Sequence, residues 1–93
     1  MYFRELAMPI VSTFFGIIIR LFHSDHNPPH FHAAYGSDEA IIEIRTGKIL
    51  GGKLPPTCKK LVEEWRKLHV IELEKAWDLV SSMKIPKKIK GLE

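Results

Sequence analysis

The sequence predicts an α+β domain: a four-stranded antiparallel β-meander, followed by a C-terminal helical segment packed on one face of the sheet. Two observations lead to this fold class. In the first half, short runs of alternating apolar and polar residues are separated by turn formers. From Cys58 to Val80, apolar residues recur at helical spacing, and no glycine or proline interrupts them. The change of period places the sheet before the helical segment.

The first predicted strand covers Phe14 to His23, which is rich in aromatic and β-branched residues. Alternation puts one set of side chains on a single face: Phe15, Ile17, Ile19, Leu21 and His23. Residues 24–29 then concentrate turn formers and include two consecutive prolines, which fix two backbone φ angles. We therefore expect a stiff connection to the second strand.

The next three strands follow from tight turns. His30–Tyr35 resumes alternation, and Gly36-Ser37 is a two-residue hairpin signal that leads into Asp38–Arg45. In that third strand Ala40, Ile42 and Ile44 share one face. Thr46-Gly47 makes another turn, and Lys48 begins a fourth strand that Gly51-Gly52 ends.

The helical segment begins after Leu54, where proline suits a first helical turn. Trp65, His69, Leu73 and Trp77 follow one another at four-residue steps and form one face. A single straight helix would be long for so small a domain, so we expect a bend near residues 69–71 and an end around Met83. The predicted core joins this face to the sheet through Ile17, Ile19, Ile42, Ile44, Trp65 and Trp77.

The length of 93 residues fits one domain, for which we predict residues 8–83. Residues 1–7 precede a second methionine and are interpreted as an N-terminal extension. Residues 84–93 are interpreted as a basic tail, whose four lysines and one glutamate account for the whole net charge of +3. The remainder is charge-balanced, so any attraction to nucleic acid is expected to come from the tail, and its deletion to leave folding intact.

Composition excludes several classes of protein. The lone cysteine, Cys58, excludes an internal disulfide and zinc sites built on several thiols, and it fits a reducing, cytoplasmic compartment. The longest apolar stretch, Phe14 to Phe22, is interrupted by Arg20 and is too short to cross a bilayer. We expect no membrane partner.

Most of the histidines of the chain lie around the proline turn, where four fall within ten residues: His23, His26, His30 and His32. In a strand, His30 and His32 project to the same side at about 6.8 Å, close enough to share one ion or one phosphate. Asp25 could orient one of the rings through its second nitrogen. These residues are the candidate site.

Three interpretations of the cluster stay open. His26, His30 and His32 could hold a divalent transition metal such as zinc, which neutral imidazoles suit. Alternatively, His30, His32 and Asp25 could carry acid-base catalysis, for example in a nuclease. Otherwise the segment is a rigid corner in which the histidines, Asp25 and Asn27 bond to the turn backbone. Whether the protein is an enzyme is left open by the sequence.

Other conspicuous residues are expected to be structural. His69 lies on the apolar helix face and is interpreted as a packed histidine. Trp65 and Trp77 are interpreted first as residues that anchor the core and only second as residues that bind a partner. Cys58 is interpreted as a small hydrophobic residue.

Most of the chain, from Met8 to about Ile89, resembles the prokaryotic family called domain of unknown function 4160. The resemblance is carried by FFGIIIRLF, EAIIEIRTGKILGG and LPPTCKKLVEEWRKLHVIELEKAWDLV, and most specifically by DHNPPHFH at residues 25–32. Genes of this family commonly lie beside another small gene, in an arrangement that looks like a toxin-antitoxin pair.

The resemblance therefore implies a component of a toxin-antitoxin-like two-gene module with a cognate small protein partner. RNA or DNA is a further partner to consider, and a homo-oligomer is left open. A histidine-cluster hydrolase, metal-dependent or acid-base, is the alternative.

Overall fold

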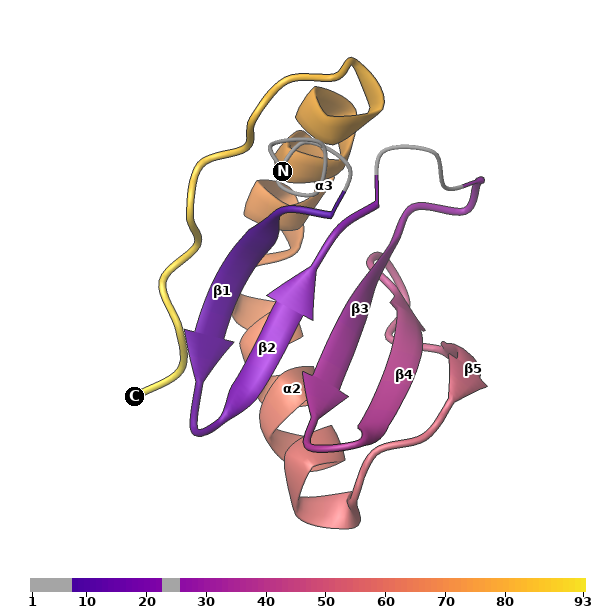
Figure 1. Ribbon diagram of the computed structural model, residues 1–93, viewed down its shortest axis with the longest axis vertical. Helices are drawn as coiled ribbons and strands as arrows, with labels where there is room; N and C mark the ends of the chain where they lie inside the picture. Colours follow the sequence, from indigo (N-terminus) through magenta and orange to yellow (C-terminus); the bar gives the residue numbers. More distant parts are fainter. Residues whose placement is uncertain (1–7, 23–25) are drawn as a thin grey trace.

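A computed structural model describes residues 8–22 and 26–93 of the chain. Its elements are five strands and two helices: β1 (Ile10–Phe14), β2 (Ile17–Arg20), β3 (His30–Tyr35), β4 (Asp38–Glu43), β5 (Ile49–Gly52), α2 (Pro56–Leu68) and α3 (Val70–Ser81). The strands form one antiparallel sheet in the order β1-β2-β3-β4-β5 (Figure 1). The α+β class is confirmed, with five strands in place of the four predicted.

The additional strand arises within the stretch that the sequence analysis assigned to one strand. Phe15 and Gly16 have φ angles of 50° and 81°, and they form the two-residue turn between β1 and β2. Positive φ at both central residues gives a turn whose twist matches antiparallel strands. Phe15 is consequently 58% exposed, whereas its expected neighbours Ile17, Ile19 and Leu21 are buried. The prediction of one strand over Phe14–His23 is wrong because the apolar run conceals this turn.

The remaining strand predictions agree closely with the structure. β3 has the predicted bounds, and Tyr35 pairs with Asp38 around the two-residue turn. β5 ends at Gly52, where φ is +72° and an added Cβ would lie 2.0 Å from the carbonyl oxygen of Glu39. Only glycine can close the sheet at that point.

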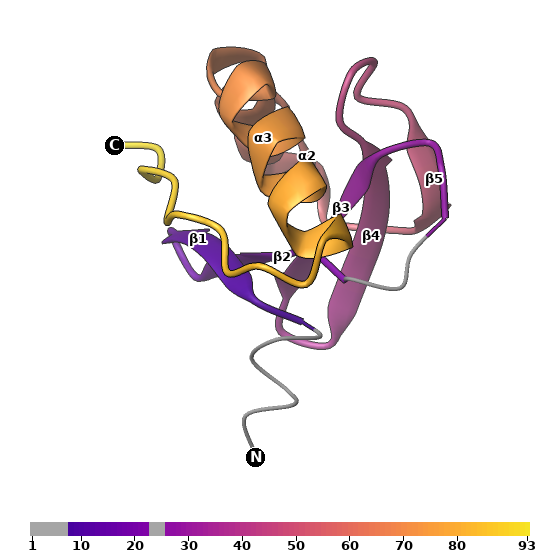
Figure 2. The same ribbon diagram turned by 90° about the horizontal axis from the view of Figure 1, so that it is seen from above.

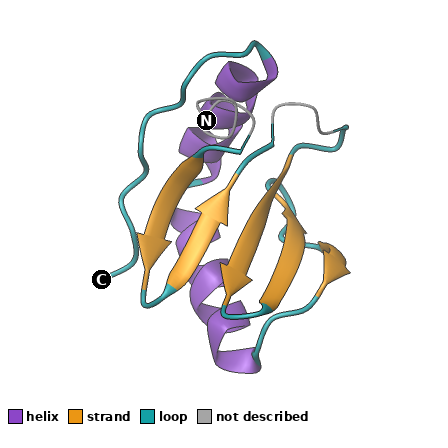
Figure 3. Ribbon diagram, viewed as in Figure 1, coloured by secondary structure: helices purple, strands orange, loops and turns teal. Residues whose placement is uncertain are grey.

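Both helices lie on one face of the sheet (Figures 2 and 3), and within residues 8–22 and 26–93 no helix or strand covers the other face, which is called the open face below. The predicted bend occurs at His69, whose backbone is not helical and separates α2 from α3. All six predicted core residues are buried: Ile17, Ile19, Ile42, Ile44, Trp65 and Trp77. Among the described residues, neither helix has the length and apolar character needed to cross a membrane.

Residues 84–93, which the sequence analysis interpreted as a basic tail, pack against the domain. The segment runs along the outer side of β1 (Figure 1). The backbone N–H of Ile89 donates to the carbonyl oxygen of Val11 at 2.7 Å, and the indole Nε1–H of Trp65 donates to the carbonyl oxygen of Lys90 at 2.9 Å. Ile89 is 5% exposed and belongs to the core. The high lysine content of the segment obscured its apolar anchors, which also include the buried Pro86 and the partly buried Leu92.

Candidate functional site

His30 begins β3 and is held by the proline turn that precedes it. Its Nδ1–H donates to the carbonyl oxygen of Pro28 at 2.8 Å, and the Asn27-Pro28 peptide is cis. The ring is buried and lies 5.1 Å, centroid to centroid, from the indole of Trp77 on α3. His30 therefore joins the turn to the helical layer, as the interpretation of a rigid corner requires.

His32 lies two residues further along β3 and is on the open face of the sheet, opposite to the helices. Its Nδ1–H donates to Oε2 of Glu39 at 2.8 Å, and its ring lies 4.1 Å from the ring of Phe22. The side chain of His32 is 12% exposed and that of Glu39 is 51% exposed. Because Glu39 holds the Nδ1–H, the tautomer and orientation of the imidazole are both fixed.

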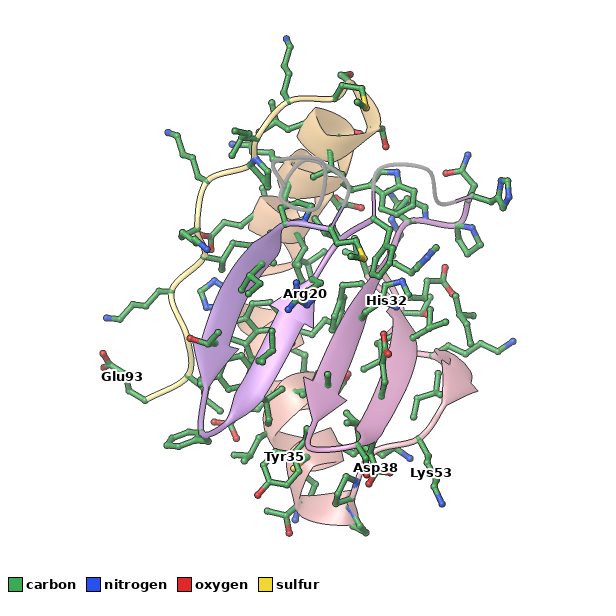
Figure 4. All side chains as sticks on the ribbon, in the orientation of Figure 1. Arg20, His32, Tyr35, Asp38, Lys53 and Glu93 are labelled. Carbon is green, nitrogen blue, oxygen red and sulfur yellow. The ribbon has the colours of Figure 1, made fainter. Side chains whose placement is uncertain are left out.

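Arg20 lies on β2 directly opposite His32 in the strand register. Its guanidinium donates to the carbonyl oxygen of Met8 at 3.2 Å, and within residues 8–22 and 26–93 it makes no ion pair with a carboxylate. Figure 4 shows Arg20 and His32 on neighbouring strands of the uncovered face. The two side chains are therefore close enough to act on one ligand.

These side chains line a shallow pocket of about 220 Å³. Its walls come from three adjacent strands and the residues that flank them: Met8, Ile18, Arg20, Phe22, His32, Ala34 and Glu39. One cation, one imidazole and one carboxylate thus meet beside an aromatic ring. This combination can bind an anionic group and move a proton.

The structure brings together some of the predicted site residues and separates others. The rings of His30 and His32 lie 5.5 Å apart, so the predicted shared face is formed. His26 lines a different cleft, together with Asn27, Trp77, Asp78, Ser81 and Ser82. The predicted role of Asp25 falls outside the described residues.

Within the part of the chain that the structure describes, no group of three or more His, Cys, Asp or Glu side chains is arranged to hold a metal ion. His26, His30 and His32 consequently do not form a three-ligand set there. The predicted zinc site also involved the neighbourhood of Asp25, so it stays a prediction.

The shifted pKa values belong to ion pairs far from the pocket. A hydrogen bond from Arg66 is the main cause that lowers the pKa of Glu63, and the same bond raises the pKa of Arg66. Arg66 is buried and also donates to the carbonyl oxygens of Ile44 and Arg45, at 2.9 Å and 3.2 Å. This pair fastens α2 to the end of β4 and is structural.

The other residues singled out in the sequence have structural surroundings. His69 stands at the corner between the helices, pairs with Glu72 and lies 5.5 Å from the indole of Trp65. Cys58 is buried in the core as a small hydrophobic residue. These positions therefore add nothing to the candidate site.

Of the residues that line the pocket, only His32 was a predicted site residue, and those missed include Arg20, Phe22 and Glu39. A signal for Glu39 was present, because a two-residue turn at Gly36-Ser37 pairs Ala34 with Glu39 and puts the carboxylate diagonally next to His32. Arg20 offered none, since its pairing with His32 spans the long connection between β2 and β3.

A family model described as "Domain of unknown function (DUF4160)" matches residues 16–78. The matched region contains Arg20, His32 and Glu39 and ends within α3, whereas β1 and the C-terminal segment lie outside it. Neither a curated protein nor a solved structure matches the chain. The description of the family assigns no activity, so the function is argued from the geometry.

Proposed function

The chain belongs to the DUF4160 family, and from this premise we propose that it is one component of a two-gene, toxin-antitoxin-like module that acts by binding a small protein partner. The gene arrangement implied by the resemblance supports the pairing. The partner is the product of the neighbouring small gene, and nucleic acid is a further ligand of the pair.

The observation that carries this proposal is the open face of the sheet, which no helix or strand of the described part of the chain covers. Both helices pack on the opposite face (Figure 2). Apolar side chains nevertheless remain half-buried on the open side: Ile18, Phe22, Ala34 and Ile41. An antiparallel sheet can leave one face in water, but that face is then usually polar. Contiguous apolar surface with a polar rim is typical of a protein interface.

The charges on this face specify the chemistry of the partner. Arg20 has no carboxylate partner among the described residues and stands beside Ile18 and Phe22 in the same pocket. A partner that covers the face would bury the guanidinium, which is costly unless a carboxylate meets it. We therefore expect the partner to present apolar side chains around an aspartate or a glutamate.

Co-purification with the product of the neighbouring gene tests the proposal. Ile41→Asp puts a charge in the centre of the open face, and the matched control Ile71→Asp makes the same change at an exposed position on α3. We expect a stable complex with the wild type and the Ile71→Asp control, and loss of the complex with Ile41→Asp.

Thermal melts establish that both variants are folded, and Arg20→Glu provides a second variant in case Ile41→Asp is not. Charge reversal at Arg20 should also abolish the complex, with rescue by a basic residue at the matching carboxylate of the partner. Failure of the two gene products to associate would refute the proposal. A complex that survives both open-face variants would place the interface elsewhere.

A second candidate function is a histidine hydrolase, because Glu39, His32 and His30 form a contiguous group. A carboxylate that holds an imidazole through Nδ1 is the usual support of a general base. We expect the double variant His30→Asn, His32→Asn to stay folded and to lose activity or metal uptake. Metal analysis of untagged protein separates a metal-dependent from an acid-base mechanism. A destabilised double variant with full specific activity would assign both histidines to the fold.

A further inference from the structure

We infer that a basic groove between α3 and the C-terminal segment (residues 84–93) binds the phosphodiester backbone of nucleic acid without reading its sequence. The groove lies beside α3, which packs on the face of the sheet opposite to the open face (Figure 2). This inference rests on the part of the proposed function that names nucleic acid as a further ligand, and it gives that ligand a surface. Binding is measured on the protein alone, so it can fail while the complex with the small protein partner still forms.

Positive charge lies on both walls of the groove, which encloses about 330 Å³. Lys75 on α3 belongs to one wall, and Lys87 and Lys88 of the C-terminal segment belong to the other. The described lining also includes one carboxylate, that of Glu72, which already accepts a hydrogen bond from Nδ1–H of His69. Three cations against one carboxylate give the groove an excess of positive charge, which attracts anions.

Lys87 and Lys88 are held at the groove because residues on both sides of them are buried. Pro86 and Ile89 are buried, and the backbone N–H of Ile89 bonds to a carbonyl oxygen of β1. The amine of Lys88 also donates to the carbonyl oxygen of Ile10 at 2.8 Å. An anionic ligand therefore meets charges on an ordered backbone, which lowers the entropic cost of binding.

The lining of the groove favours a chain of phosphates over a protein or a membrane. Ala76 and Ile89 are only 4% and 5% exposed, and Leu79 is partly buried, so little apolar surface is available. A protein partner usually needs apolar anchors at the centre of its interface. A bilayer also attracts lysines, but its surface is flat and does not enter a groove. A linear chain of phosphates can meet lysines on both walls.

The groove also changes the experiment that the sequence suggests. The sequence analysis assigned any attraction to nucleic acid to residues 84–93 alone, whereas the groove adds Lys75 on α3. Deletion of residues 84–93 would remove the buried Ile89 as well as the lysines, so a loss of binding could follow from a loss of stability. Replacement of exposed lysines separates the two effects, and both Lys75 and Lys87 are exposed.

The test measures binding of the full-length protein to two short, fluorescein-labelled single-stranded RNAs of unrelated sequence, by fluorescence anisotropy at several salt concentrations. We expect both RNAs to bind equally well, with log K falling against log salt at a slope of about −2 for three lysines. The double variant Lys75→Gln, Lys87→Gln should flatten this slope by about 1.4 and raise Kd about 10-fold or more at low salt. Lys88 is left in place because its amine also bonds to Ile10.

The matched control is the double variant Lys59→Gln, Lys60→Gln, which removes the same charge from exposed positions on α2. Neither residue lines the groove, so Kd should change by less than about 2-fold. Thermal melts establish that both double variants are folded, and the single replacements of Lys75 and Lys87 take the place of the double variant if it is not. Equal losses in the groove variant and the control would show a diffuse effect of net charge and overturn the inference.

Glu72→Gln predicts the opposite result, because it removes the carboxylate that lines the groove. We expect Kd to fall about 2- to 5-fold at low salt, since a repulsive charge disappears while the amide oxygen can still accept the bond from His69. Glu64→Gln makes the same change at an exposed position on α2 and is the control. An affinity that rises no more in Glu72→Gln than in Glu64→Gln would show that the phosphates lie elsewhere.

Two other anions identify the alternative ligands. Tighter binding of poly-L-glutamate than of RNA, at equal concentration of charge, would assign the groove to an acidic protein segment. Binding to phosphatidylserine vesicles that is lost in the groove variant, while binding to RNA is not, would assign it to a membrane surface. Either result, or a wild type that binds neither RNA, would refute the inference. The complex with the neighbouring gene product is measured separately with the open-face variants, so the two proposals fail independently.

Discussion

The C-terminal segment offers a sharp test of the fold, because Ile89 is one of the side chains that anchor it to the core. Ile89 is 5% exposed, while Ile85 in the same segment is 71% exposed. Ile89→Ala removes three buried carbon groups and keeps the backbone hydrogen bonds. Each group contributes about 0.8 kcal/mol, so the loss by transfer alone is about 2.4 kcal/mol.

The complete effect should be close to that value. A cavity adds to the transfer loss, but a segment at the edge of the domain can relax into the space, which keeps the cost near the lower end of Ile→Ala substitutions. We expect the free energy of unfolding to fall by about 2 to 3 kcal/mol, which corresponds to roughly 10 to 20 °C in Tm for a chain of this size.

Urea denaturation followed by tryptophan fluorescence measures the effect, because Trp65 lies under the segment and bonds to Lys90. The control Ile85→Ala makes the same chemical change at an exposed position and should alter stability by less than about 0.5 kcal/mol. Deletion of residues 84–93 should cost more than Ile89→Ala, since it also leaves the indole N–H of Trp65 without its acceptor. Equal, small effects of both alanine variants would show that the side chain of Ile89 does not anchor the segment.

Three further predictions concern α2 and α3. Arg66→Met should destabilise the domain by about 2 to 4 kcal/mol in chemical denaturation, because the guanidinium supplies charged hydrogen bonds to two strand-end carbonyl oxygens. An unchanged midpoint would show that those bonds contribute nothing. The lowered pKa of Glu63, caused first by the hydrogen bond from Arg66, means that its contribution is present at neutral pH and is lost as the pH falls through that lowered pKa. Glu63→Gln should therefore be less stable than the wild type at pH 7, and the difference should shrink in acid; a constant difference across pH would contradict the assignment. Trp77→Ala should cost about 3 to 5 kcal/mol, and a loss under about 1 kcal/mol would exclude its side chain from the core.

The elements that local patterns determine were predictable from the sequence. Alternation and the Gly36-Ser37 turn fixed β3 and the start of β4, and helical spacing fixed the face that contains Trp65 and Trp77. The turn at Phe15-Gly16 was missed because a phenylalanine with positive φ is unusual. In addition, the hydrophobic residues on both sides of the turn give the pattern of one continuous strand. The packing of the segment around Ile89 was missed for a related reason, since four lysines obscured the buried Pro86 and Ile89.

For the candidate site, too, only the features that local sequence patterns determine were predictable. That His30 and His32 share a strand face follows from a period of two, and the structure places their rings 5.5 Å apart. Which of the two histidines can act on a ligand depends on the residues that surround each ring outside β3. Trp77 buries one ring against the helical layer, whereas Glu39 and Arg20 flank the other on the open face.

Those surroundings depend on register between strands that are distant in sequence. A shift of β2 by one residue would turn Arg20 into the core and bring Ile19 opposite His32. The register is held because Ile17 and Ile19 must be buried, which leaves Arg20 on the open face. The core thus keeps Arg20 on the same face of the sheet as His32, and the observed register places the two residues opposite each other.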